Sequence, residues 1–167
     1  VIDGATNATT TVATGSGPGS VAVNPVTNRI YVATWNDNEV TVIDGATNAT
    51  TRVAAGSGPL CVAVNPVTNR IYVANKTGNS ITVIDGATNA TITVAAGTGP
   101  EAVAVNPVAN TIYVANGNRE NVTVIGGATN ATTTVAAGRN PLSVAPNPVT
   151  NKVYVVNINS NDVTVID

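Results

Sequence analysis

The sequence contains no histidine, no methionine and no phenylalanine, and it has a single cysteine, Cys61. Because histidine is the commonest general base and metal ligand, its absence excludes a Ser-His-Asp or Cys-His catalytic site. One cysteine cannot form a disulfide within the chain. The equivalent positions of the sequence repeats carry Ser20, Ala102 and Ser143, so we interpret Cys61 as a small packed residue rather than a reactive thiol.

Charge is also scarce. Asp, Glu, Lys and Arg make up 10% of the residues, against about a quarter in an ordinary soluble domain. The net charge is −2 and the basic residues form no run, which argues against a nucleic-acid or anionic-lipid partner. No apolar run approaches the roughly 18 residues of a membrane span, so membrane insertion is not expected. The missing initiator methionine leads us to expect a mature or excised segment.

What the sequence does contain is a regular repeat. Val-Ile followed by Asp or Gly begins at residues 1, 42, 83, 124 and 165, always 41 residues apart. The chain therefore divides into repeats 1–41, 42–82, 83–123 and 124–164, followed by residues 165–167, and we treat it as a single propeller domain or half of one. A period of this length is typical of repeat architectures such as β-propellers.

Each period reads as four short strands separated by turns, for example residues 39–44, 51–55, 61–65 and 70–75. The strands are rich in β-branched residues, and the segments between them contain Gly, Pro and Asn. No segment has helical spacing of apolar residues, and most strands are apolar on both faces, as expected for sheets covered on both sides. The pattern predicts an all-β propeller of four-stranded antiparallel blades. A β-sandwich or a stacked β-solenoid is the alternative, although tight turns such as NPVTN are unusual for a solenoid.

A tetrapeptide near the end of each repeat points to a family. It is YVAT at Tyr31, YVAN at Tyr72 and Tyr113, and YVVN at Tyr154, and a G-x-x-P motif precedes VAVNP. These motifs resemble the YVTN family of β-propeller repeats over essentially the whole chain. The chain departs from the family pattern at three positions: Thr34, Val156 and Pro146.

The resemblance implies a surface-layer or other cell-envelope protein of a prokaryote, and hence an extracellular or cell-surface location. Because the family is defined by its fold, it implies no catalytic residue, cofactor or metal. It also implies the strand order within a blade, with SVAVN innermost, then RIYVA, VTVID and finally TTTVA outermost. Pro146 would then lie on the edge strand that lines the channel, where the loss of one N–H group is tolerated.

The two ends of the chain complement one another. Residues 9–13 read as an outermost strand without most of its neighbour, and the last blade, residues 142–167, has no outermost strand. Strand exchange between the N- and C-termini would close a ring and remove the open sheet edge.

The size of that ring follows from the outermost strands, whose small side chains should make blades that pack at a small angle. Four blades require about 90° between neighbours and eight require about 45°, by division of the circle. We therefore expect two chains to form one eight-bladed ring. A head-to-tail polymer, a four-bladed ring and a segment cut from a longer propeller remain open.

Two further patterns fall in turns. Asp3, Asp44, Asp85 and Asp167 recur at the end of one strand, but Gly126 breaks the series, and the spacing matches no calcium loop. We interpret these carboxylates as hydrogen-bond acceptors for the turn backbone. Asn-x-Thr occurs at Asn7, Asn48, Asn75, Asn89, Asn121 and Asn130. Turn chemistry accounts for most of these sites, and glycosylation stays open.

Differences between repeats gather in two loop sets that a propeller places on one face. The residues that stand out there are Trp35, Asp37, Glu39, Lys76, Glu101, Arg119, Glu120, Arg139 and Asp162. Neutral drift of exposed loops would produce the same pattern. The functional interpretation is a recognition surface for a surface protein or a glycan, with Trp35 as its aromatic anchor.

The sequence therefore predicts a non-catalytic extracellular or cell-surface module for binding or assembly, which is expected to self-associate and to need no cofactor. The alternative is a lyase- or lactonase-like propeller enzyme that acts at the channel mouth.

Overall fold

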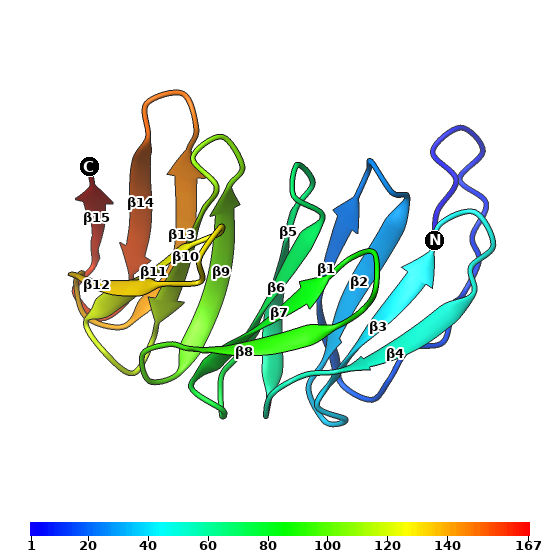
Figure 1. The fold of residues 1–167 in the computed structure, drawn as a ribbon, viewed down its shortest axis with the longest axis horizontal. Coiled ribbons are helices and arrows are strands. Elements are labelled where there is room, and N and C mark those ends of the chain that lie inside the picture. The colour runs from blue at the N-terminus through cyan, green and yellow to red at the C-terminus, as the bar shows by residue number, and fades with distance from the viewer.

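Fifteen β-strands make up the computed structural model, which describes all residues from Val1 to Asp167 and contains no helix (Figure 1). The predicted all-β class is therefore confirmed. The strands form four separate antiparallel sheets, three with four strands and one with three. The structure accordingly holds no helix long and apolar enough to cross a lipid bilayer.

The strands follow the chain order within every sheet, and each neighbour in sequence is a neighbour in the sheet. The first sheet consists of β1 (Pro18–Asn24), β2 (Arg29–Thr34), β3 (Glu39–Asp44) and β4 (Thr50–Ala54). The second consists of β5 (Pro59–Asn65), β6 (Arg70–Asn75), β7 (Ser80–Asp85) and β8 (Thr91–Ala95). The third consists of β9 (Pro100–Asn106), β10 (Thr111–Asn116), β11 (Asn121–Gly126) and β12 (Thr132–Ala136). The fourth consists of β13 (Pro141–Asn147), β14 (Lys152–Asn157) and β15 (Asp162–Ile166).

The predicted strands agree closely with these bounds. The predictions for β3 and β6 are correct to the residue, and β4 is displaced by one residue from the predicted range 51–55. β5 begins two residues before the predicted start at Cys61, because Pro59 still pairs with Asn75 across a bulge. Such a bulge adds a residue to one strand while the ladder continues beyond it.

Asparagine accounts for the tight turns between the strands. Twelve residues other than glycine have a positive φ, and all of them are Asn. Asn48, for example, has φ 61° in the hairpin that joins β3 to β4, and Asn69 has φ 52° in the hairpin that joins β5 to β6. Asn adopts this left-handed conformation more readily than other non-glycine residues because its short polar side chain bonds locally. The tight turns and loops therefore account for a large part of the abundance of Asn.

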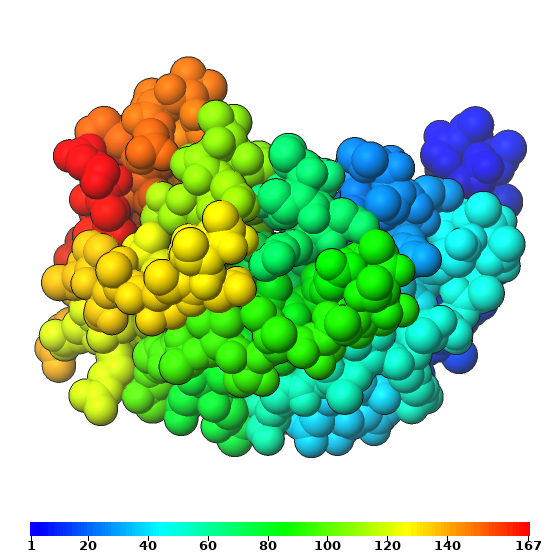
Figure 2. Space-filling model, in the orientation of Figure 1, coloured from blue at the N-terminus to red at the C-terminus, as the bar shows by residue number.

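The four sheets stack face to face in the order of the chain, as the succession of colours in Figures 1 and 2 shows. Hydrophobic clusters lie between neighbouring sheets. The cluster between the first two sheets, for example, joins Tyr31 and Val42 of one sheet to Ile71 and Ile84 of the next. Equivalent clusters join the second sheet to the third and the third to the fourth. Both faces of the inner sheets are thus covered, which explains their apolar character on both sides.

The two ends of this row are open. The N-terminus and the C-terminus lie at opposite sides of the molecule (Figure 1), and no strand ladder joins the first sheet to the last. Residues 9–13, predicted as a strand, are not one, apart from a single bridge between Ile2 and Thr9. The reason is that a strand needs a neighbour for its hydrogen bonds, and none runs beside residues 11–13. The prediction that the last sheet lacks its outermost strand is correct.

Candidate functional site

The variable loops lie together on one side of the sheets, which we call the loop face. The loop after the second strand of a sheet bonds to the loop before its first strand, as in Lys76 N–H to Gly58 O at 2.8 Å and Trp35 N–H to Gly17 O at 2.9 Å. The hairpins that hardly change between repeats meet on the opposite side, where Gly45 N–H donates to Asn28 O. The fold therefore brings the predicted loop residues to a common surface.

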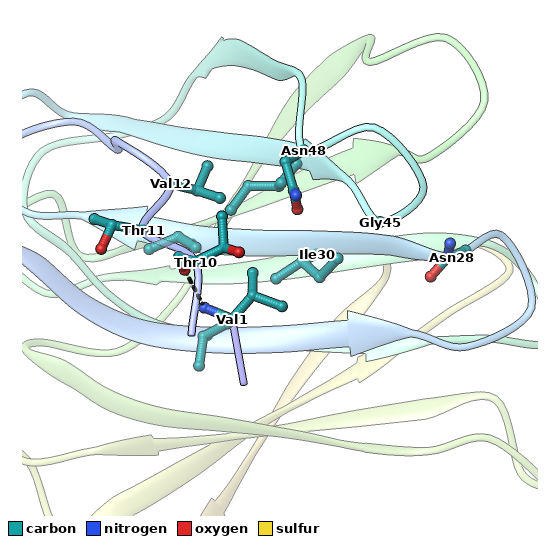
Figure 3. A pocket seen from close by; sticks show the side chains of 11 residues that line it. Val1, Thr10, Thr11, Val12, Asn28, Ile30, Gly45 and Asn48 are labelled. Carbon is teal, nitrogen blue, oxygen red and sulfur yellow. Dashed lines mark hydrogen bonds between the residues drawn. The ribbon is translucent and has the colours of Figure 1, made fainter. Parts of the chain in front are cut away.

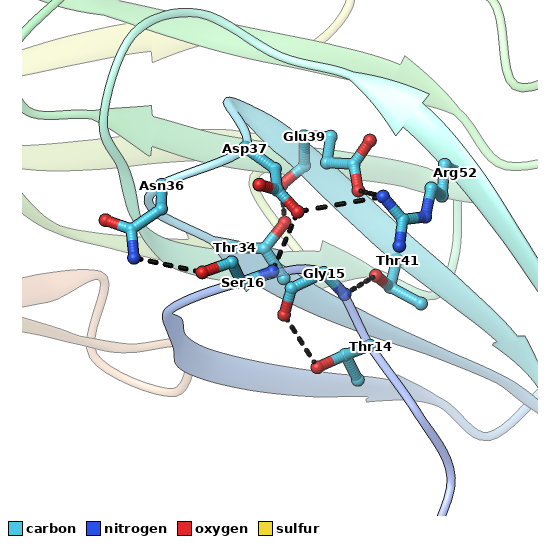
Figure 4. A network of polar contacts seen from close by, with 9 residues as sticks. All are labelled: Thr14, Gly15, Ser16, Thr34, Asn36, Asp37, Glu39, Thr41 and Arg52. Atoms are coloured by element: carbon cyan, nitrogen blue, oxygen red, sulfur yellow. Dashed lines mark hydrogen bonds and ion pairs between the residues drawn. The ribbon is translucent and has the colours of Figure 1, made fainter.

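Arg52 organises the charges of the first sheet on this face (Figure 4). Its guanidinium lies 2.9 Å from a carboxylate oxygen of Glu39 and 3.6 Å from one of Asp37. Asp37 also accepts a hydrogen bond from the backbone N–H of Ser16, at 2.8 Å. Sequence reasoning missed Arg52, although it is the one charged residue in an outermost strand. Asp37 and Glu39 are therefore occupied by a partner in their own chain.

Other predicted charges on the loop face pair between neighbouring sheets. The ammonium of Lys76 lies 2.6 Å from a carboxylate oxygen of Glu101, and Nε of Arg139 lies 3.6 Å from one of Glu120. The exposed Arg139–Glu120 pair contributes little stability, but both pairs neutralise the charge that a ligand would meet. The loop face therefore presents fewer unpaired charges to a ligand than its number of charged residues suggested.

The remaining two charged candidates bond to uncharged groups. A carboxylate oxygen of Asp162 accepts from Nδ2 of Asn157 at 2.7 Å, inside the fourth sheet. Nε of Arg119 donates to Oγ1 of Thr98 at 3.3 Å.

A polar hollow of about 290 Å³ opens on the loop face between the third and fourth sheets. Its lining has no apolar residue and includes Asn118, Arg119, Glu120, Arg139, Asn140 and Asn159. Guanidinium and amide groups of this kind donate hydrogen bonds to carboxylates and hydroxyl groups. This hollow is the part of the loop face best suited to a small polar ligand.

Trp35 is half-buried and does not project freely from the surface. Its ring lies over Gly58 in the loop that leads into the second sheet, so closely that a Cβ atom on Gly58 would come within 3.1 Å of Cη2. Gly58 has φ +65°, a conformation that glycine adopts without strain. The predicted role of Trp35 as an exposed anchor thus competes with its packing against its own chain.

Three of the four recurring aspartates cap the hairpins on the opposite side, as the sequence predicted, whereas the carboxylate of Asp167 pairs with the ammonium of Lys152. Oδ1 of Asp44 accepts from the backbone N–H of Ala46 at 3.0 Å and of Thr47 at 2.9 Å, and also from the Thr47 hydroxyl. The bond from the Thr47 backbone is the main reason why the pKa of Asp44 lies below its ordinary value. Asp3 and Asp85 make the same bonds, and the same cause lowers the pKa of each. These carboxylates are structural parts of the turns.

No three residues among Asp, Glu and Cys lie close enough together to hold a metal ion.

The Asn-x-Thr positions differ in their surroundings. Asn7, Asn48, Asn89 and Asn130 are the positive-φ residues of the hairpins. Asn75 is completely buried and donates to Ser80 and Thr82, so its side chain is closed to glycosylation in the folded chain.

The joints between sheets are made in a repeated way. On the inner side of each joint, a buried Asn at the end of the first strand donates to the turn Asn of the next sheet. These pairs are Asn24–Asn69 and Asn65–Asn110 at 2.9 Å, and Asn106–Asn151 at 3.2 Å.

Tyr72, from the middle of the second sheet, is fully buried at the joint between the second and third sheets. Burial raises the pKa of its hydroxyl, because the phenolate would lose its solvation.

The two end faces of the row lack this cover. Tyr154, the equivalent of Tyr72, is 40% exposed on the fourth sheet, and Val165 beside it is 49% exposed. On the first sheet, a cavity of about 620 Å³ lies between the N-terminal segment and the face that carries Val21 and Ile30 (Figure 3). Sequence reasoning did not identify this apolar cavity.

Comparison with known proteins gives a likeness of fold. No protein-family model matches the sequence, and no curated protein matches it either. Among solved structures, a chain of Kuenenia stuttgartiensis hydrazine synthase is similar at 21% identity and a TM-score of 0.77, over 99% of this chain and 53% of that one. A functionally unknown protein from Desulfotomaculum acetoxidans is similar at 19% identity and a TM-score of 0.71, over 90% of this chain and 54% of that one. The chain thus spans about half the length of these two structures and shares their stacked-sheet fold.

Proposed function

We propose that this protein is a non-catalytic β-propeller module of the prokaryotic cell surface, and that it assembles with copies of itself through the end faces of its row of sheets. The resemblance of its YVAN motifs to YVTN repeats supports the propeller architecture and the location. The stacked four-stranded sheets are in keeping with propeller blades. Two chains would form one ring of eight blades, and a head-to-tail polymer is the other form of the same assembly.

The observation that carries the proposal is the difference in exposure between equivalent residues. Tyr72 is completely buried inside the row, whereas Tyr154 is 40% exposed at its end. The first sheet presents Val21, the equivalent of the buried Val62, to solvent. The two end faces therefore carry the two halves of a joint that the chain already builds three times. Burial of such apolar surface is the main driving force for association.

The mass of the particle in solution tests the proposal. Native mass spectrometry and light scattering over a range of concentrations should show a particle of twice the chain mass of 16.6 kDa. Val163→Glu, which places a charge on the fourth sheet's open face, should abolish this particle. Val67→Glu, in an exposed turn away from both end faces, is the matched control and should leave it intact. A single-chain particle at every concentration would contradict the proposal.

The non-catalytic part of the proposal is tested separately. Metal analysis of the purified protein should find no stoichiometric ion. An ion held by three or more side chains near the axis would contradict it and favour the lyase- or lactonase-like alternative.

The polar hollow on the loop face supports a second, weaker role in binding a surface glycan or protein. Arg119, Arg139 and Glu120 line it together with three Asn residues, which favours an oligosaccharide that carries both hydroxyl groups and an acidic group. Calorimetric titration with such an oligosaccharide should detect binding, and the double change of both arginines to Ala should remove it. Failure of the unchanged protein to bind would contradict this role without affecting the assembly proposal.

A further inference from the structure

The outer edge of β15 has no partner, although every other third strand has one. In the first sheet, β3 pairs with β4 so that Glu39 lies opposite Ala54 and Ile43 lies opposite Thr50. The same register on the fourth sheet would place Asp162 opposite residue 13 and Ile166 opposite residue 9 of an added strand. Residues 9–13 (TTTVA) have the sequence of β12 (TTTVA), the outermost strand of the third sheet.

The segment that follows residues 9–13 makes the same contact with the first sheet that the segments after β4 and β8 make with the next sheets. Gly15 N–H donates to Oγ1 of Thr41 at 3.1 Å. At the internal joints, Gly56 makes the same bond to Thr82 at 3.0 Å, and Gly97 makes it to Thr123 at 3.1 Å. The connection into the first sheet is therefore anchored in its usual place. What is missing is the third strand that should run beside residues 9–13.

The N-terminal tripeptide Val1-Ile2-Asp3 occupies part of the place of that missing strand. Val1 N donates to Thr10 O at 2.8 Å, and Thr10 N–H donates back to Val1 O at 2.9 Å. Val1-Ile2-Asp3 has the same sequence as Val165-Ile166-Asp167. It is poorly packed, however, because Val1 is 68% exposed and Ile2 is 71% exposed. Both tripeptides would occupy the same position beside Thr10, so only one of them can be there.

The polar groups at the two open ends match as well. Asn147 on β13 corresponds to the donor Asn24, and Asn28 corresponds to the acceptor Asn69. Asn147 is half-buried and Asn28 is exposed, and neither side chain has a partner in another sheet.

A second polar match involves Ser143, on the same strand β13 as Asn147. Ser143 corresponds to Ser20, whose hydroxyl accepts from Val62 N–H at 3.2 Å, and Val21 corresponds to Val62. The end faces thus carry the same hydrogen-bond pairs as the joint between the first and second sheets.

We infer that a second copy of this chain docks by strand exchange, with residues 9–13 of one copy forming the missing outermost strand beside β15 of the other. Val165–Asp167 of the incoming copy displaces the identical Val1–Asp3 from its position beside Thr10. This inference rests on the proposed assembly function and specifies the partner, the register and the segment that gives way. β15 should displace Val1–Asp3 for two reasons. It would pair five residues with residues 9–13, whereas Val1–Asp3 forms a single bridge, and its other edge is already paired with β14.

A disulfide between two different chains tests the register. One chain carries Thr9→Cys and the other Ile166→Cys, each in a Cys61→Ser background, which uses the residue found at this position in two other repeats. In the predicted ladder these two side chains lie directly opposite each other at a non-hydrogen-bonded position, where Cβ atoms are closest. After mixing under mild oxidation, we expect a two-chain disulfide to form at least tenfold faster than with Val165→Cys, whose side chain points to the other face.

The outcomes separate the inference from the function on which it rests. A two-chain particle that forms no preferential disulfide between positions 9 and 166 would overturn the strand exchange and leave the assembly proposal standing. A chain that stays monomeric would overturn both.

Two substitutions test the displacement. Val165 occupies the place of Val1, whose nitrogen bonds to Thr10, so its N–H points to the open edge rather than to β14. Val165→Pro therefore removes an edge donor without breaking a bond of the free chain, and it should weaken association at least tenfold. Ile2→Gly weakens only the segment that is displaced and should strengthen association severalfold. Weaker association of the Ile2→Gly chain would mean that Val1–Asp3 belongs to the joint, and would overturn the exchange.

Discussion

The Nδ2 amide of Asn65, at the end of β5, donates to Oδ1 of Asn110, 2.9 Å away in the hairpin of the next sheet. Asn65 is completely buried, and its own Oδ1 accepts from the backbone N–H of Val67 at 3.1 Å. A single side chain thus closes a turn within its sheet and ties that turn to the neighbouring sheet. Because a buried amide is costly when unpaired, this bond also fixes how the two sheets sit relative to each other.

Replacing Asn65 with Ala should lower the free energy of unfolding by about 1–3 kcal/mol, because the Asn110 acceptor and the Val67 N–H lose their partner. Urea unfolding measures this change. Asn147→Ala is the matched control, since Asn147 has no neighbouring sheet within the chain. Asn147 still accepts from the backbone N–H of Val149 at 2.9 Å, so at concentrations where the chain is monomeric its replacement should cost about 0.5–1.5 kcal/mol less than that of Asn65, the difference being the bond between sheets. Equal losses for the two variants would contradict the role of the bond between sheets.

Trp35→Ala should lower the free energy of unfolding by about 1–2 kcal/mol, less than the roughly 3–5 kcal/mol lost when a fully buried aromatic is removed. The reason is that the ring is half-buried against Gly58. Thermal unfolding measures the loss. Gly58→Ala should also destabilise the chain, because its φ of +65° strains any other residue and its new Cβ would meet the ring. An unchanged melting temperature for Trp35→Ala would contradict this packing and would favour Trp35 as an exposed anchor for a partner.

Acid should destabilise the protein through the hairpin aspartates. The backbone bonds to Asp44 and Asp85 hold the pKa of each carboxyl below its ordinary value of 3.8 in the folded chain. A lowered pKa in the folded state adds stability above the unfolded pKa, and this stability disappears as the pH falls through the folded value. The melting temperature should therefore decline below about pH 4. Between pH 5 and 7 it should be nearly constant, because the chain has no histidine.

Two variants separate these aspartates from other acid effects. Asp85→Asn keeps an acceptor oxygen but cannot titrate, so its melting temperature should fall less steeply with acid. Gly126→Asp introduces a carboxylate at the one hairpin that lacks it, where a new Cβ would lie 3.1 Å from Oγ1 of Thr129. Its melting temperature should fall more steeply. Parallel acid profiles for both variants and the unchanged chain would contradict the assignment.

Arg52→Thr should lower the free energy of unfolding by less than about 1 kcal/mol, although it removes two ion pairs. The guanidinium is largely exposed, and Thr93 and Thr134 show that Thr suits this position of the outermost strand. Denaturant unfolding at low and at high salt measures the change, and the difference between the two proteins should shrink at high salt. A loss above about 2 kcal/mol would mean that the Arg52 pairs hold the first sheet together.

Prediction from sequence was most accurate where the signal is local. The bounds of β3 and β6 were correct because alternating β-branched residues, Pro and Asn encode strand and hairpin within a few positions. The hydrogen bonds of Asp44 and Asp85 were also foreseeable, since donor and acceptor are two or three residues apart. Such contacts do not depend on where the rest of the chain lies.

The contacts within the candidate site could not be predicted in this way. The loop residues do share one face, but nothing in the sequence revealed that Lys76 would pair with Glu101 or that Trp35 would lie on Gly58. Residues 9–13 were wrongly predicted as a strand, because the pattern reports the propensity of a segment and not the presence of a neighbour. Each of these outcomes depends on residues more than twenty positions away.

By itself, the sequence determined the repeat, the four strands in each period and the hairpins that join them, since these follow from backbone preferences of neighbouring residues. Only the tertiary structure decided which groups are left without partners. Tyr72 and Tyr154 stand in nearly the same local sequence, yet one is buried and the other is 40% exposed. The difference arises because burial of a sheet face requires a second sheet against it, and that second sheet is supplied by the packing of distant parts of the chain or by another molecule.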